Sequence, residues 1–133
     1  MEVIDCDKIE SAANAYVFKD GLLYGAFDNR LLWCSPQKKG TLYIPEKIKQ
    51  VCACAFAGCE KLTEVYLPEG VEKIGDCAFM GAVSLKSVSL PSSVLHIGFN
   101  AFGDTNKSLS IHCEQDAFAH KFATENGLLV SNL

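Results

Sequence analysis

The stretch AFAGCEKLTEVYLPEGVEKIGDCAF, residues 55–79, decides the fold, because it opens and closes on the same Ala-Phe pair 23 residues apart. The spacing continues along the chain. Ala101-Phe102 follows one period later, and Leu67-Pro68 recurs as Leu90-Pro91. A period in the range of about 20 to 50 residues indicates that a chain stacks copies of one structural unit.

Each copy consists of short apolar runs separated by Pro and Gly, which favours strands and turns over helices. One copy cannot close a core by itself, so we expect the copies to stack about 4.8 Å apart with equivalent apolar side chains in buried columns. Phe79 is predicted to lie fully buried between Phe56 and Phe102. Gly75 and Gly98 are expected to mark a tight bend between strand and loop.

The pattern from Phe56 to Phe79 resembles the signature of the BspA-like, or treponemal-type, leucine-rich repeat family. Upstream, Asp20-Gly21 and Asp28-Asn29 indicate two hairpin turns joining three short strands, similar to a variant segment often found between such repeats. The resemblance covers residues 14–133. It implies a mostly β leucine-rich-repeat solenoid with a little helix, and a role in binding protein and not in catalysis.

We expect one domain over residues 1–133, in which 1–43 form an N-terminal cap and β-hairpin variant segment, 44–113 hold three repeats, and 114–133 form a C-terminal cap. Capping is needed because terminal repeats otherwise expose apolar faces and unpaired strand edges. A strand or a short helix is expected within residues 1–15.

The C-terminal cap is predicted in more detail. Asp116 is expected to cap the start of a helix that ends before a left-handed Gly127, and residues 128–130 should add a final strand. Phe118 and Phe122 lie four residues apart, so both are expected to cover the last repeat. The third copy is degenerate, since Ser108 stands where earlier copies have leucine.

The seven cysteines are read as free thiols, because an odd number leaves at least one unpaired and a secreted protein usually avoids that. Cys54 and Cys77 are one period apart, within reach of a disulfide, yet we expect both to remain free. Cys59 should be buried. The acidic N-terminus lacks the features of a secretion signal. These observations favour a cytoplasmic location, with the cell surface as the alternative if a signal has been removed.

Several function classes are disfavoured. Cys52, Cys54 and Cys59 lack the second ligand cluster of a zinc site, so no metal or cofactor is expected. His96 and His112 differ in repeat phase and His120 lies in the expected helix, which disfavours a Cys/His catalytic pair. A net charge of -4 argues against nucleic acid as a partner. No apolar stretch approaches the ~20 residues that a membrane-spanning helix needs.

The candidate binding residues are the outward-facing positions of the Leu-x-x-Val-x-Leu strands. Because successive side chains of a strand point to opposite faces, the period predicts two exposed columns. One column contains Thr41, Glu64, Ser87 and Ser110, and the other contains Tyr43, Tyr66, Ser89 and His112. The tyrosines are read either as a solvated aromatic ladder or as interface anchors. Trp33 is read either as core or as a further anchor.

These observations predict a non-catalytic module that presents a rigid concave β surface to a protein partner. A small intracellular regulator or inhibitor is one form of this prediction. The alternative, drawn from the resemblance, is a bacterial or protist cell-surface or adhesion protein.

Overall fold

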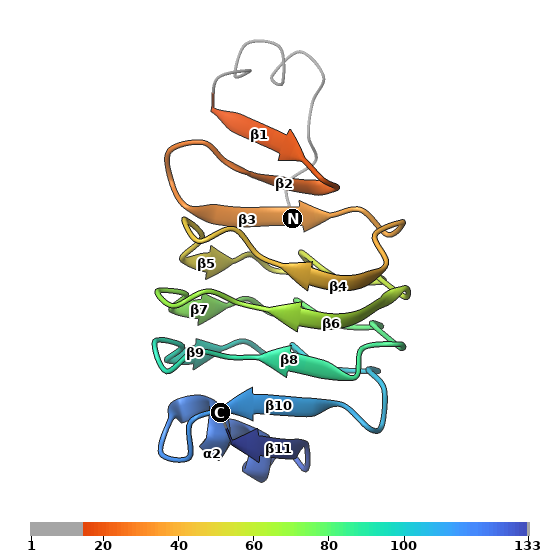
Figure 1. Cartoon of the computed structure of the whole chain (residues 1–133), viewed down its shortest axis with the longest axis vertical. Helices are drawn as coiled ribbons and strands as arrows, with labels where there is room; N and C mark the ends of the chain where they lie inside the picture. Colours follow the sequence, from red (N-terminus) through yellow and green to blue (C-terminus); the bar gives the residue numbers. More distant parts are fainter. Residues whose placement is uncertain (1–14, 133) are drawn as a thin grey trace.

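The structure of the chain, a computed structural model, describes residues 15–132. Its turns stack along one axis, with β1 at one end and α2 and β11 at the other (Figure 1). A six-stranded sheet contains, in order, β1 (Tyr16–Lys19), β2 (Leu22–Gly25), β3 (Arg30–Cys34), β5 (Gln50–Val51), β7 (Lys73–Ile74) and β9 (His96–Ile97). A five-stranded sheet contains β11 (Leu129–Asn132), β10 (Ser110–Cys113), β8 (Ser87–Ser89), β6 (Leu62–Tyr66) and β4 (Gly40–Tyr43).

Each repeat contributes one strand to each sheet, and equivalent strands pair in parallel. The predicted fold, a mostly β solenoid of 23-residue repeats followed by a helix, is confirmed. The core consists of stacked columns. The rings of Phe56 and Phe79 lie 4.8 Å apart at 2°, and those of Phe79 and Phe102 lie 5.2 Å apart at 4°. Phe79 is fully buried, as predicted.

Gly75 and Gly98 lie between a strand and a turn, as predicted, and they allow neighbouring turns to approach each other closely. A Cβ on Gly75 would lie 2.5 Å from the amide nitrogen of Ala53, and one on Gly98 would lie 2.5 Å from that of Asp76. Neither glycine has a positive φ. Positive φ values occur two residues after this position in each repeat, at Cys54 (φ 60°), Cys77 (φ 56°) and Asn100 (φ 56°).

The N-terminal segment is the predicted pair of hairpins. β1 pairs antiparallel with β2, and β2 with β3. Asp20 and Asn29 have positive φ values of 53° and 60° at the two turns, where Asp and Asn tolerate the left-handed region better than most residues. β3 then pairs in parallel with β5, which joins the hairpins to the repeats. The expectation for residues 1–14 lies outside the described residues.

The C-terminal cap departs from the prediction at its start. Helix α2 (Phe118–Glu125) begins after an extended Ala117, and no side chain caps it, so the expected role of Asp116 is wrong. Phe118 is exposed and does not cover the stack. Ala119 and Ala123 are buried instead, since small side chains bring the helix close to the last turn, and Phe122 packs on Phe102 with centroids 6.1 Å apart.

Other features of this end agree with the prediction or refine it. Gly127 has a φ of 70° after the helix, and β11 follows it, both as expected. In the degenerate third copy, Ser108 is exposed and the next residue, Leu109, is buried. The third copy therefore keeps an apolar side chain in the core by a shift of one residue.

Candidate functional site

The outward face of the five-stranded sheet carries the two columns of side chains predicted from the period. The strand pairs that form the first column are Thr41 with Glu64, Glu64 with Ser87, and Ser87 with Ser110. Those that form the second are Tyr43 with Tyr66, Tyr66 with Ser89, and Ser89 with His112. Thr41 and Tyr43 are exposed and the other six are half-buried. The predicted register is confirmed.

β11 extends both columns by one residue each, which the period did not predict. Leu129 pairs with Ser110, and Ser131 pairs with His112. The hydroxyl oxygens of Ser110 and Ser131 are 3.3 Å apart, within hydrogen-bonding distance. Leu129 lies only 19 residues after Ser110 because α2 replaces part of a repeat, so a search at a spacing of 23 misses it. The predicted final strand over residues 128–130, placed beside β10, is the signal that could have identified these positions.

Tyr43 and Tyr66 form the aromatic centre of this surface. Their rings stack with centroids 4.7 Å apart at 10°. The Tyr66 hydroxyl donates a hydrogen bond of 2.8 Å to Oε2 of Glu64, and this bond raises the pKa of Tyr66. Tyr43 is 71% exposed, so its ring is held in place by Tyr66 while most of its surface meets solvent. The pair forms the predicted aromatic ladder, and Tyr43 is exposed, as an interface anchor would have to be.

A groove of about 380 Å³ lies beside Tyr43. β4 is one of the two edge strands of the five-stranded sheet, and the groove separates it from the β1–β2 hairpin. Its lining residues are Lys19, Asp20, Leu22, Tyr24, Lys38, Thr41, Leu42, Tyr43 and Pro45. No repeat period relates the hairpin to β4, so the groove could not be found from the sequence.

Trp33 lies on the other sheet, on β3, and the structure does not bring it together with the tyrosine pair on β4 and β6. It is half-buried, and its ring stacks on that of the exposed Phe18 with centroids 6.2 Å apart at 26°. Trp33 is therefore not a fully buried core residue. Phe18, which the sequence analysis did not single out, forms an aromatic pair with it.

The thiols and imidazoles are dispersed over the fold. Six cysteines of the described part of the chain are free, and Cys59 is fully buried as predicted. Sγ of Cys59 lies 3.6 Å from the carbonyl oxygen of Cys34. His96, His112 and His120 lie on β9, β10 and α2. Within residues 15–132, no group of three or more His, Cys, Asp or Glu side chains is placed to hold a metal ion.

None of the helices found between residues 15 and 132 has the length and apolar character needed to cross a membrane.

Comparison with protein families gives a match over residues 33–123 to the BspA type leucine rich repeat region, in six copies. A search of curated proteins finds no match.

Three solved structures share the fold. The pneumococcal vaccine antigen PcpA is 22% identical (TM-score 0.66), over 75% of this chain and 31% of that one. A leucine-rich repeat protein of T. pallidum is 24% identical (TM-score 0.54), over 76% of this chain and 51% of that one. A leucine-rich cell surface protein of Faecalibacterium prausnitzii is 23% identical (TM-score 0.59), over 89% of this chain and 39% of that one. The chain thus spans about a third to a half of the length of each of these proteins.

Proposed function

Since the chain belongs to the BspA-type leucine-rich-repeat family, we propose that it is a protein-binding module displayed outside the cell. The observation that carries the proposal is the stacked pair of Tyr43 and Tyr66 on the five-stranded sheet. The pair presents an aromatic surface on a sheet whose inward-facing side chains are buried in the core. Rigid aromatic side chains are among the residues that most often dominate the binding energy of protein interfaces.

The stacking favours binding because it reduces the conformational entropy that the tyrosine side chains lose when a partner binds. A free tyrosine loses side-chain freedom when a partner immobilises it, and this loss opposes association. Tyr66 is already held by Tyr43 on one side and by the hydrogen bond to Glu64 on the other. The groove beside Tyr43 would accept a partner side chain adjacent to the pair. We therefore place the centre of the interface at Tyr43, with the Thr41 and Glu64 column as its polar border.

A matched pair of crosslinking sites tests the location of the interface. Tyr43 is 71% exposed on the five-stranded sheet, and Leu95 is 70% exposed next to β9 of the opposite sheet. A photoreactive phenylalanine placed at position 43 should crosslink to a protein partner, and the same group at position 95 should not crosslink to that partner. Crosslinking from position 95 alone would contradict the proposal.

Location outside the cell is supported by two of the structural relatives, one described as a cell surface protein and one as a vaccine antigen. A second candidate is an intracellular regulator or inhibitor. It is favoured by the six unpaired cysteines of the described residues, because disulfides predominate over free thiols in secreted domains.

Labelling intact cells of the source organism with a membrane-impermeant amine reagent separates the two candidates. The chain contains 11 lysines, and many of them, such as Lys19 and Lys73, are exposed. A surface protein is labelled in intact cells, with a cytoplasmic enzyme as the unlabelled control. Labelling that requires cell lysis would favour the intracellular candidate.

A further inference from the structure

The loops that connect the turns on the side of the six-stranded sheet form a regular backbone ladder. Amide groups of one turn donate to carbonyl oxygens of the next. Between the first and second turns the bonds are Cys54 to Asp76 (3.0 Å), Phe56 to Ala78 (2.7 Å) and Gly58 to Met80 (2.9 Å). Between the second and third they are Cys77 to Phe99 (2.9 Å), Phe79 to Ala101 (2.7 Å) and Gly81 to Gly103 (2.9 Å).

This ladder stops at the third turn. The equivalent amides of Asn100, Phe102 and Asp104 donate to no acceptor among residues 15–132. On the strand itself, the carbonyl oxygens of Val51 and Ile74 each accept a 2.8 Å bond from the next turn, whereas that of Ile97 accepts none within the same residues. The six-stranded sheet ends at β9, while the five-stranded sheet continues through β10 to β11.

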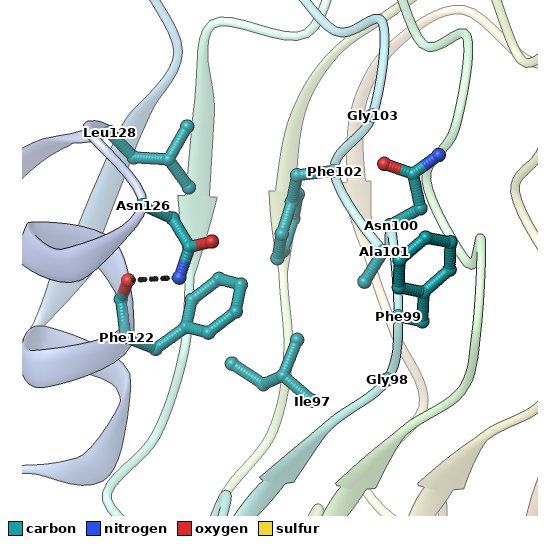
Figure 2. A pocket seen from close by; sticks show the side chains of 10 residues that line it. All are labelled: Ile97, Gly98, Phe99, Asn100, Ala101, Phe102, Gly103, Phe122, Asn126 and Leu128. Atoms are coloured by element: carbon teal, nitrogen blue, oxygen red, sulfur yellow. Dashed lines mark hydrogen bonds between the residues drawn. The ribbon is translucent and has the colours of Figure 1, made fainter.

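A groove of about 460 Å³ lies where the next turn would be. One wall is the open segment from Ile97 to Gly103, and the other wall is formed by Phe122, Asn126 and Leu128 of the cap (Figure 2). Phe122 extends the column of phenylalanine rings beyond Phe102, with centroids 6.1 Å apart. The cap thus supplies the aromatic side chain of a further turn but not its backbone.

We propose that this groove binds an extended segment of a partner protein, which pairs in parallel with β9 as an added strand. The open carbonyl of Ile97 lies on the strand, and the open amides of Asn100, Phe102 and Asp104 follow it along the wall. A polypeptide that is extended beside β9 and then follows the path of the preceding turns satisfies them by strand addition. This site is separate from the tyrosine pair, which lies on the other sheet.

The packing between turns also defines which segment fits. Gly75 and Gly98 each pass the preceding turn so closely that a Cβ would lie 2.5 Å from a backbone nitrogen. A segment in the groove approaches Gly98 and Phe99 in the same way, so it requires glycine at the equivalent position. It needs no large side chain at the position equivalent to Phe102, because Phe122 already occupies that place.

A peptide with the sequence of residues 95–101, LHIGFNA, is a suitable probe because it copies the third turn. Labelled with fluorescein and titrated with the full chain, it should give saturable binding by anisotropy. The same peptide with alanine in place of glycine should bind at least about tenfold more weakly, since its Cβ would meet backbone. On binding, hydrogen exchange at the amides of Asn100 and Phe102 should slow.

Two phenylalanines provide matched variants of the protein. Phe99 is 80% exposed and lines the groove, whereas Phe27 is 81% exposed in the hairpin segment. F99A should weaken peptide binding about tenfold through the lost apolar contact, while F27A should leave it unchanged. The Y43A/Y66A variant should also bind the peptide normally, so the failure of one proposal does not affect the other.

Three results would overturn the proposal. One is the absence of saturable binding at millimolar protein, and another is equal affinity for the glycine and alanine peptides. The third is self-association of the chain that protects the Phe102 amide without peptide, since this would assign the groove to a second copy.

Discussion

The rings of Tyr43 and Tyr66 lie parallel, 4.7 Å apart, although 23 residues separate them in the chain. The stacking of the two rings should stabilise the fold, in addition to forming the proposed binding surface. A double-mutant cycle of Y43A and Y66A, read by urea unfolding, is expected to give a coupling free energy of about 0.5–1.5 kcal/mol. Strictly additive effects of the two substitutions would mean that the rings do not stack in solution.

The phenylalanine column should contribute much more. Phe79 is fully buried between two rings, so F79A removes these contacts and leaves a cavity that costs about 3–5 kcal/mol. F99A is a control of the same chemistry at an exposed position, and its cost should stay within about 0.5 kcal/mol. Chemical denaturation measures both. Similar costs for the two variants would argue against this register of the repeats.

The left-handed positions predict a gain of stability. Cys77 has a φ of 56°, which asparagine, the residue found one period later at position 100, adopts at lower cost. C77N should therefore raise the free energy of unfolding by a few tenths to about 1 kcal/mol. C77V should lower it, because β-branched side chains are strained in this region. If valine is tolerated as well as asparagine, Cys77 is not left-handed.

Stability should fall at alkaline pH because of the buried thiols. Burial raises the pKa of Cys113 and of Cys52. The folded state therefore holds these protons above the ordinary thiol pKa of 9.0, at which the unfolded chain loses them. The contribution of each thiol is fully present below pH 9 and decreases above it, by at most about 1.4 kcal/mol per pH unit.

Unfolding free energies at pH 7.5, 9 and 10 measure this effect. C113A removes one of the thiols, so its stability should depend less steeply on pH than that of the wild type. Parallel pH profiles for the two proteins would show that Cys113 ionises as readily in the folded state as in the unfolded chain.

The repeat period was sufficient to predict the sheet face, because one spacing determines which residues share a column. Thr41, Glu64 and Ser87 could be aligned from the sequence alone for this reason. The hairpins could be predicted from local turn chemistry at Asp20 and Asn29.

Features that depend on contacts between unlike segments could not be predicted. The start of α2 depends on how Ala119 and Ala123 fit against the last turn, so the local signals at Asp116 and Phe118 were misleading. Both grooves lie between a repeat and a segment that is not a repeat. The left-handed conformation of Cys54 and Cys77 was also missed, since cysteine does not favour it and only Asn100 indicates it.

The most direct test of the proposed function is the affinity for the partner identified by crosslinking from position 43. Isothermal titration should show that Y43A/Y66A, folded by circular dichroism, loses at least about 2 kcal/mol of binding free energy, or roughly 30-fold in Kd. F27A/L95A, which removes exposed apolar side chains away from the five-stranded sheet, should bind like the wild type. Affinity of the tyrosine variant within about 1 kcal/mol of the wild type would contradict the proposal and direct attention to the Trp33 and Phe18 pair.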